Sequence, residues 1–564
     1  MLPLAALAVV LALVFVLIAD RVLFQALASR HDPIDSISTL IDDHRRETGS
    51  KDNMSTPNGG AVCADNDALT RPLTIQIGKS KVSTSIYSLI VMSLTSVYSR
   101  MQFSFPVSVS NNEWVAAEVL RERFLLSQQS EDAVEATAEL EDDTQATVEL
   151  FARFLAFAAE NLKPTETCSA SRTAVLLSAL KTFTDSYLYK KDIHSLAVAY
   201  DVDVRKTVLS SYYTALAVLE KQKVSGIPRG PVSAVLAAAT KGEASLYALF
   251  GGQGTNEVYF DELQSLFDIY KPFVAPFVAS LSINVLQPLA VASTTSYYAY
   301  GLDVISWLSG ALPRPPVEYF ASVPVSLPLI GLTQLTQYLV SCHVLNITPG
   351  EMRSLLHGTT GHSQGLVSAV SIAASSSYES FDQNSAKALK WLFFCGLRGQ
   401  EAFPVVALEP SIVNDAIEGG EGTPSPMLSV AGLPLKDLEP HIAKTNKHLP
   451  ANSQLQVSLH NGPKAFVVTG PAKALYGLVT SLRKVRAPAG LDQSKTPFSQ
   501  RKPAFSVRFL VVATPYHSEF LRPATDKLLS DLQGEELWTT SELAIPVYHT
   551  EDGLLIFSFT DFRV

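Results

Sequence analysis

Hydrophobic and polar positions along the chain fall into blocks that predict different structures. Residues 2–19 form an unbroken apolar run that is long enough to span a bilayer as a helix. Residues 21–69 are polar and contain many Asp, Gly, Ser and Asn residues, a composition typical of a linker. Between residues 70 and 240, apolar positions recur mostly at three- and four-residue spacing, which predicts a mostly helical region.

The pattern changes after residue 240. The stretch "SLYALFGGQGTNEVYFDELQSLFDIY" begins with a short apolar run, breaks at a cluster of glycines and resumes as an amphipathic helix. This pattern predicts a strand, a turn and a helix. A second glycine-rich stretch, "HGTTGHSQG" (357–365), is followed by the small-residue helix "LVSAVSIAAS". Together these units predict an α/β core.

Residues 424–490 have a different order of elements. The sequence predicts a strand in "PMLSVAG", a helix in "PLKDLEPHIAKTNKHL", two strands in "LQVSLHNG" and "AFVVTG", and a helix in "AKALYGLVTSLRKVRA". A further strand is predicted in "RFLVVATPYH" (508–517). This order is that of a ferredoxin-like subdomain. The predicted fold class is therefore α/β, preceded by a mostly helical N-terminal region.

Two interpretations of residues 2–19 stay open. The first is a membrane anchor: the run lacks the basic residues that precede a secretory signal peptide, and Arg21, Arg30, Arg45 and Arg46 follow it. That excess of positive charge would leave the rest of the chain in the cytosol. The second is that the run does not belong to the functional protein, for instance because translation starts further on. Both interpretations predict a cytoplasmic location for the remaining chain.

Composition excludes several classes of function. The chain has 564 residues, 47% hydrophobic and 17% charged, which predicts two to four structural units with a large buried core. The formal net charge of −10, without any basic tract, argues against nucleic-acid binding. The four cysteines lie far apart and form no C-x-x-C pair. They therefore predict neither a metal site nor a disulfide framework, and they favour a reducing compartment.

Ser363 is the first candidate catalytic residue. It stands at the centre of Gly361-His362-Ser363-Gln364-Gly365, a G-x-S-x-G pattern that often places a nucleophile on a sharp strand-to-helix turn. At the start of the following helix, the backbone N–H of Gln364 is placed to stabilise an oxyanion. A glycine-rich turn without any catalytic role has the same pattern, so the motif alone does not identify an enzyme.

A serine nucleophile needs a base, and His517 has the best context of the 11 histidines. It follows a predicted strand and precedes a helix, where the active-site residues of α/β folds gather. His362 adjoins the serine, but neighbouring side chains on a sharp turn diverge, which makes it a poor base. The turn "FGGQG" (250–254) lacks the Lys-Ser/Thr ending of a phosphate-binding loop. Its functional alternative is an oxyanion donor, the backbone N–H of Gln253.

Seven motifs occur in an order that resembles one family. They are "LFGGQGTNEVYFDEL", "TGHSQGLVSAV", "LFFCGLRGQEAFP", "PSPMLSVAGL", "VSLHNGPKAFVVTGP", "GLDQSKTPFSQRK" and "RFLVVATPYHSEFLRPATD". Together they are similar to the acetyltransferase region that opens the β subunit of fungal type I fatty acid synthase, and to the related starter-unit acyltransferases. The similarity begins near Thr70 and extends almost to the C-terminus. By this resemblance, residues 241–423 and 491–550 form an α/β-hydrolase-like acyltransferase core around the ferredoxin-like subdomain.

The resemblance implies a two-step transfer of an acetyl group, or of another short neutral starter, in fatty acid biosynthesis. Ser363 would attack the thioester of acetyl-CoA, with His517 as general base and later as general acid. The acyl-serine would then pass its group to the phosphopantetheine thiol of an acyl carrier domain on a synthase α subunit. The backbone N–H groups of Gln253 and Gln364 would form the oxyanion hole. The chain itself would bind no cofactor and would assemble with the synthase complex.

Cys395 bears on the choice of substrate. Malonyl-selective relatives carry an arginine at the position that Cys395 takes in "WLFFCGLRGQ", and that arginine binds the malonyl carboxylate. A buried carboxylate without such a partner is strongly disfavoured, so the resemblance favours a neutral acyl group. Arg398 lies about one helical turn further on and is assigned to the surrounding structure. Asn461 and His362 are also expected to line the substrate pocket.

The chain departs from the family in three places. The residues before Thr70 have no counterpart, the stretch 87–105 is interpreted as an insertion, and the ending after about residue 550 leaves the family pattern. These departures leave it open whether the chain is a truncated β subunit or a freestanding enzyme.

Three other functions stay open. The first is a starter-unit acyltransferase of a polyketide-linked fatty acid synthase. The second is a membrane-tethered serine esterase with an acidic residue between Ser363 and His517 in the sequence; the ferredoxin-like block and the "GQG" turn argue against it. The third is a non-catalytic assembly fragment of the synthase, against which the presence of Ser363, Gln253 and His517 argues.

Overall fold

A computed structural model gives the fold of the chain. It describes residues 74–77, 80–83, 89–95, 100–106, parts of 117–127, 144–161, 169–189, 191–254 and 258–555, the last range without 489, 491, 495, 536, 551 and 552. Before residue 107 only the backbone is described. The apolar run 2–19 and the linker 21–69 lie outside the described residues.

The N-terminal region is mostly helical, as predicted, but strands precede its helices. The strands are β1 (Thr74–Ile77), β2 (Ser80–Ser83), β3 (Leu89–Thr95) and β4 (Arg100–Pro106), and they pair antiparallel as β1 with β2 and β3 with β4. The helices are α3 (Thr144–Glu160), α4 (Ser169–Phe183), the π-helical turn η2 (Thr184–Leu188), α5 (Ile193–Ala197), α6 (Val202–Lys221) and α7 (Ala234–Thr240).

Aromatic side chains hold α3, α4 and α6 together. Phe151 of α3 and Phe183 of α4 are buried, with ring centroids 5.4 Å apart in an edge-to-face arrangement. Tyr212 of α6 lies against Phe183, with ring centroids 6.3 Å apart. Because apolar residues recur every three or four positions, each helix presents one apolar face to its neighbours.

A three-stranded parallel sheet carries the core, in the order β11-β6-β5. Its strands are β5 (Leu246–Phe250), β6 (Leu356–Gly361) and β11 (Val547–Tyr548), and β6 is parallel to both neighbours. The helices are α8 (Tyr259–Ile269), α9 (Lys271–Leu281), α10 (Gln287–Ala292), α11 (Val304–Ser309), α12 (Val317–Ala321), α13 (Val323–Leu345), α14 (Pro349–Leu355), α15 (Gly365–Ala373), α16 (Tyr378–Ala402) and α20 (Arg522–Asp531). Short π or 3-10 turns are η3 (Ser282–Leu286), η4 (Ser296–Tyr298), η7 (Glu519–Leu521) and η8 (Thr540–Glu542). Parallel strands joined through helices confirm the predicted α/β class.

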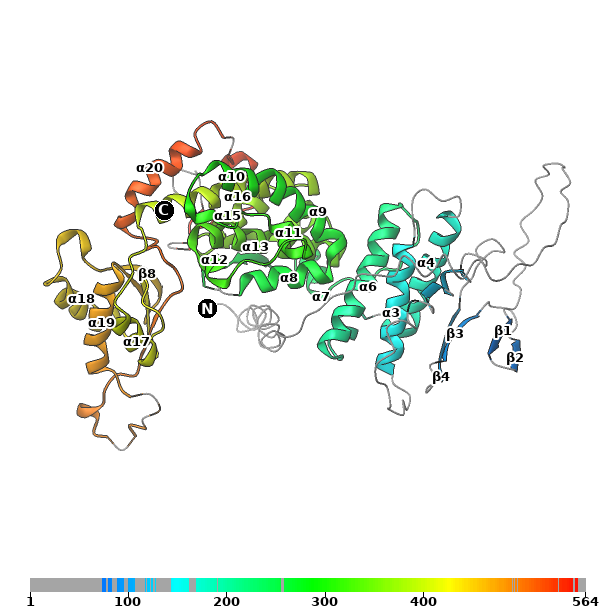
Figure 1. The fold of residues 1–564 in the computed structure, drawn as a ribbon, viewed down its shortest axis with the longest axis horizontal. Helices are drawn as coiled ribbons and strands as arrows, with labels where there is room; N and C mark the ends of the chain where they lie inside the picture. Colours follow the sequence, from blue (N-terminus) through cyan, green and yellow to red (C-terminus); the bar gives the residue numbers. More distant parts are fainter. Residues whose placement is uncertain are drawn as a thin grey trace. The chain divides into compact units, whose positions relative to one another are not determined.

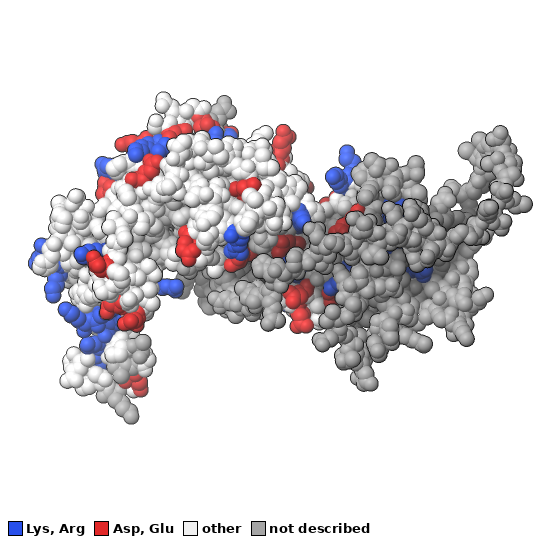
Figure 2. All heavy atoms as spheres, viewed as in Figure 1, with Lys and Arg blue, Asp and Glu red and all other residues white. Residues whose placement is uncertain are grey.

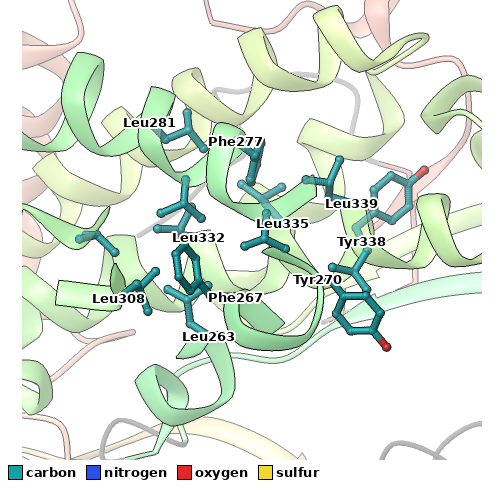
Figure 3. Packing of buried hydrophobic residues seen from close by; sticks show 14 of the residues in the cluster. Leu263, Phe267, Tyr270, Phe277, Leu281, Leu308, Leu332, Leu335, Tyr338 and Leu339 are labelled. Carbon is teal, nitrogen blue, oxygen red and sulfur yellow. The ribbon is translucent and has the colours of Figure 1, made fainter. Parts of the chain in front are cut away.

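Helix α13 is the buried centre of this core. It contacts α8, α9, α15 and α16 (Figure 1). Figure 3 shows its leucines among side chains of α8 and α9. The labelled leucines of α13 are Leu332, Leu335 and Leu339, and their neighbours include Leu263, Phe267, Phe277 and Leu281. In the described part of the chain, two helical stretches, Lys271–Ala292 and α13, have the length and composition of a membrane span, but the apolar window of α13 is 94% buried within the protein. In α13 the hydrophobicity therefore serves the core.

The second sheet confirms the predicted ferredoxin-like subdomain. Its strands are β7 (Met427–Ala431), β8 (Gln456–Gly462), β9 (Ala465–Thr469) and β10 (Ser506–Phe509), and the helices are α17 (Pro410–Glu418), α18 (Leu435–Asn446) and α19 (Ala472–Val485), with 3-10 turns η5 (Ala451–Ser453) and η6 (Phe498–Gln500). The antiparallel order is β10-β7-β9-β8, in which the first and third strands of the motif are central. The last strand, β10, lies beyond residues 424–490 and leads directly toward His517.

Candidate active site

Ser363 lies on the turn between β6 and α15, as the G-x-S-x-G pattern predicts. Its φ angle is +55°, a left-handed conformation that is unfavourable for a residue with a Cβ atom. A Cβ atom on Gly361 would overlap the backbone of Gly365, and one on Gly365 would overlap the carbonyl oxygen of Phe250. The two glycines therefore allow α15 to begin in direct contact with β5 and β6, and this contact holds the serine in its strained turn.

Residues 250–254, here called the glycine loop, lie directly against this turn. The backbone N–H of His362 donates a hydrogen bond to the carbonyl of Phe250, with N···O 2.8 Å. A Cβ atom on Gly252 would lie 2.8 Å from Nδ1 of His362 and 3.2 Å from Cβ of Ser363. A side chain at position 252 would thus crowd His362 and Ser363, which places the glycine loop close to the serine.

His517 reaches the serine from a segment 154 residues later in the sequence. It lies between β10 and the turn η7, which leads into α20. Its Nε2 atom is 2.8 Å from Oγ of Ser363, a hydrogen-bond distance. Its φ angle of +60° is also left-handed. Two residues with side chains in this sparsely populated conformation, joined by one hydrogen bond, are typical of an active site.

The environment of His517 keeps its ring uncharged at neutral pH. Burial, and to a smaller extent the electrostatic effect of the neighbouring His362, lowers the pKa of His517 to about 4. Among the described residues, no carboxylate is paired with the ring. A neutral imidazole whose Nε2 faces a hydroxyl can accept that proton, so the geometry and the pKa both suit a general base.

The two predicted oxyanion donors are backbone N–H groups on the two segments that meet at the serine. Gln253 belongs to the glycine loop and Gln364 follows Ser363 at the start of α15. Within the described residues, neither backbone N–H donates a hydrogen bond to another protein group. Donors beside a nucleophile are suited to an oxyanion when no protein acceptor occupies them.

Cys395 lies on α16 and is 6% exposed. It borders a cavity of about 10 Å³ together with Tyr516, Gly399 and Leu528. Burial raises the pKa of the Cys395 thiol to about 12, so the side chain is a neutral thiol. Arg398 binds both carboxylate oxygens of Asp531 on α20 at 2.6 and 2.8 Å. Arg398 thus joins helices α16 and α20, in keeping with its assignment to the surrounding structure.

The remaining predicted pocket residues are exposed. His362 lies on the nucleophile turn, and its ring approaches Gly252. Asn461 lies near the end of β8, and among the described residues it makes no hydrogen bond to Ser363 or His517. The structure thus brings together Ser363, His517, His362 and the glycine loop. Among the described residues, neither Cys395 nor Asn461 is hydrogen-bonded to Ser363.

The sequence did not reveal three polar residues behind the site. Gln334 and Ser326 lie on α13, and Ser368 lies on α15; all three are buried. Gln334 contacts Gly251, and Ser326 contacts the side chain of Gln253. The available signal was a set of polar residues within the apolar helix "VPVSLPLIGLTQLTQYLV". The described residues contain no group of three or more His, Cys, Asp or Glu side chains that could hold a metal ion.

Two protein families match the chain. The family described as starter unit:ACP transacylase in aflatoxin biosynthesis matches residues 248–503. The family described as the N-terminal domain in fatty acid synthase subunit beta matches residues 90–219, a range that includes most of the stretch interpreted as an insertion.

Similar curated proteins are fatty acid synthase β subunits. The chain is 40% identical over 422 residues to the Saccharomyces cerevisiae subunit, covering 73% of this chain and 20% of that protein. It is 37% identical over 463 residues to the Schizosaccharomyces pombe subunit, covering 81% of this chain and 21% of that protein. The chain thus spans about a fifth of the length of these relatives. The matches confirm the predicted resemblance.

Among solved structures, a complex of a type II polyketide synthase acyl carrier protein with its malonyl-transacylase is similar. It is 18% identical, with a TM-score of 0.37, and the match covers 56% of this chain and 77% of that chain. This likeness is too low to bear on function.

Proposed function

We propose that this chain, which resembles the N-terminal acyltransferase region of fungal type I fatty acid synthase β subunits, transfers a short neutral acyl group from coenzyme A to an acyl carrier domain. The observation that carries the proposal is the 2.8 Å hydrogen bond between Ser363 Oγ and His517 Nε2, next to the glycine loop. The reaction belongs to fatty acid biosynthesis. The chain binds no cofactor of its own and acts in the cytoplasm.

The first half of the reaction loads the serine. Nε2 of His517 accepts the proton of Ser363 as Oγ attacks the thioester carbon of acyl-CoA. The negative charge on the carbonyl oxygen is stabilised by the backbone N–H groups of Gln253 and Gln364. When the tetrahedral intermediate collapses, the carbon–sulfur bond breaks and His517 returns the proton to the departing coenzyme A thiolate. The product is an ester on Ser363.

The second half unloads the serine onto a carrier. The phosphopantetheine thiol gives its proton to His517 and attacks the ester carbon. The same two backbone N–H groups stabilise the second oxyanion. The carbon–oxygen bond to Ser363 then breaks, and the serine oxygen takes the proton back from His517. The enzyme is restored, and the acyl group has moved from one thiol to another.

The charges around α16 support a neutral acyl group. The thiol of Cys395 is uncharged, and Arg398 is held by Asp531 and Glu401. A malonyl carboxylate bound beside Cys395 would therefore compete with Asp531 and Glu401 for Arg398, and burying it without a partner is unfavourable. Acetyl is the simplest acyl group that meets this condition.

The charge of the ferredoxin-like subdomain supports an anionic partner. Residues 410–510, which include α17, contain twelve Lys and Arg residues against six Asp and Glu residues, whereas the whole chain has a net charge of −10. Figure 2 shows several basic side chains on the visible surface of this part of the chain, with acidic side chains among them. The exposed cations are Lys436, Lys444, Lys447, Lys464, Lys473, Lys484, Arg501, Lys502 and Arg508. Such a surface attracts the phosphates of coenzyme A and of a phosphopantetheinylated carrier.

The test is covalent labelling of Ser363. We expect the protein to take up acid-stable radioactivity from [1-¹⁴C]acetyl-CoA, to give it up to a phosphopantetheinylated carrier protein, and to take up much less from malonyl-CoA. Ser363→Ala should remain unlabelled. A wild-type protein that remains unlabelled by every acyl-CoA tested would exclude the transferase. Rapid hydrolysis of simple esters without acyl-CoA labelling would identify an esterase instead.

A longer starter group is the second candidate substrate. It is favoured by the match of residues 248–503 to the starter unit:ACP transacylase family. The same experiment decides between the candidates when acetyl-, butyryl- and hexanoyl-CoA compete for Ser363. Preferential labelling by hexanoyl-CoA would favour a starter-unit acyltransferase for polyketide-linked synthesis.

A further inference from the structure

Helix α13 carries a buried glutamine whose contacts all lead toward the active site. Gln334 is 9% exposed and lies between Thr333 and Leu335 in a helix whose buried residues are mostly apolar. A buried amide must satisfy its donors and its acceptor within the protein, or it destabilises the fold. The partners of Gln334 therefore show what this polar side chain does in the core.

Gln334 joins the glycine loop to α15, the helix that follows Ser363. Its Nε2 donates a hydrogen bond to the carbonyl oxygen of Gly251 at 2.7 Å, and its Oε1 accepts one from Oγ of Ser368 at 2.8 Å. Only this orientation of the amide lets the NH₂ group face the carbonyl, which is an acceptor only. Ser368 is completely buried. One side chain thus connects two segments that belong to different parts of the sequence.

Both segments carry parts of the predicted reaction centre. Gly251 is two residues before Gln253, whose backbone N–H is a proposed oxyanion donor. Ser368 is on α15, the helix for which Gln364 is the N-cap residue, just over one turn after Ser363. A displacement of Gly251 relative to α15 would therefore move one oxyanion donor relative to Ser363.

Two other buried polar residues of α13 offer a contrast. The hydroxyl groups of Thr333 and Thr336 donate to carbonyl oxygens of their own helix, those of Leu329 and Leu332, at 2.9 and 2.8 Å. These hydroxyl groups form their hydrogen bonds within α13 and do not contact the glycine loop. A buried polar residue of α13 thus does not necessarily contact the active site. Gln334 differs from Thr333 and Thr336 because its side chain bonds to the glycine loop and to α15.

We propose that Gln334 is a positioning residue that fixes the Gly251–Gln253 segment, and with it the Gln253 N–H, at the distance from Ser363 that the tetrahedral intermediate requires. The inference rests on the proposed acyl transfer. Because the oxyanion forms only during the reaction, a misplaced donor weakens the transition state more than the binding of acyl-CoA.

The first test is Gln334→Leu, which keeps the size of the side chain and removes both hydrogen bonds. We expect the maximal rate of Ser363 acylation, measured with radiolabelled acetyl-CoA in single turnovers, to fall roughly 30-fold. The concentration of acetyl-CoA at half-maximal rate should change less than about threefold. The matched control is Thr336→Val on the same helix, which should acylate at the wild-type rate.

The second test makes the contact dependent on pH. In Gln334→Glu, a protonated carboxyl can donate to Gly251 and accept from Ser368, whereas an ionised carboxylate would face the Gly251 carbonyl without a proton. Burial raises the pKa of such a carboxyl, so it is neutral at pH 5 and loses its proton as the pH rises. We expect the acylation rate of this variant to fall between pH 5 and pH 8, while the wild-type rate stays nearly constant.

The outcomes separate the inference from the proposed function. A wild-type protein that is never acylated contradicts the proposed function. A wild-type protein that is acylated while Gln334→Leu retains its maximal rate overturns the positioning role, and so does a Gln334→Glu profile parallel to the wild type. If Gln334→Leu unfolds, as judged by circular dichroism, the Gln334→Glu profile alone decides.

Discussion

The nucleophile turn, residues 361–365, and the glycine loop, residues 250–254, lie side by side but are built in different ways. The turn is determined locally: its two flanking glycines permit a close approach of backbones, and Ser363 takes a left-handed conformation between them. The loop depends on side chains that are 83 and 73 residues away, namely Gln334 at Gly251 and Ser326 at Gln253. A local motif thus specifies the position of the proposed nucleophile, while tertiary packing specifies that of the proposed oxyanion loop.

The nucleophile turn and the glycine loop are in contact at Gly365, and a substitution there should have the largest effect on acylation. A Cβ atom on Gly365 would overlap the carbonyl oxygens of Phe250 and Gly251, which are backbone atoms and cannot rotate away. We expect Gly365→Ala to abolish Ser363 labelling by acetyl-CoA and to lower the free energy of unfolding in urea by about 3 kcal/mol.

Gly254→Ala is the matched control for this substitution. Among the described residues, nothing lies within 4 Å of a Cβ atom there, and its φ angle is not left-handed. This variant should label normally and unfold at nearly the wild-type urea concentration. If Gly365→Ala also labelled normally, the close contact between turn and loop would not exist in solution.

The difference between turn and loop also explains what the sequence could predict. The G-x-S-x-G pattern located Ser363, and the order of strands and helices predicted both the α/β core and the ferredoxin-like sheet. The role of Gln334 could not be predicted, because the sequence pattern does not distinguish Gln334 from Gln337, which lies three residues later on the same helix. Only the packing of α13 shows that Gln334 reaches Gly251, whereas Gln337 faces Glu262 near the surface.

Two further features needed the structure. The 154-residue separation of Ser363 and His517 is bridged by the path from β10 to α20, and no local signal fixes that distance; their pairing was expected only from the resemblance. The strands at 74–106 precede a region whose periodicity is helical, and short strands carry little periodic signal of their own.

The pH dependence of acylation tests the histidine that serves the turn. Because burial lowers the pKa of His517 to about 4, the ring is neutral and able to accept a proton at every pH well above 4. We expect kcat/KM for acetyl-CoA to be constant between pH 5 and pH 8. As the pH falls below about 4, the ring becomes protonated and the rate should drop tenfold per pH unit. A decline that already begins near pH 6.5 would mean that the ring is exposed to water in solution.

The smallest effect is expected at the second anchor of the glycine loop. Nε2 of Gln253 donates to Oγ of Ser326 at 3.2 Å, and this contact holds the side chain of Gln253 while its backbone is held through Gly251. Loss of one partly buried hydrogen bond costs about 1 kcal/mol, so Ser326→Ala should slow acylation about fivefold or less.

The acylation rates of the wild type, Ser326→Ala, Gln334→Leu and the double variant form a double-mutant cycle. If Gln334 and Ser326 hold the same loop, Gln334→Leu already releases the loop, and removing the Ser326 contact then has little further effect. The fold-decrease in acylation rate of the double variant should therefore be smaller than the product of the two single fold-decreases. Losses that multiply would show that the two anchors act independently, and the glycine loop would then not move as one unit.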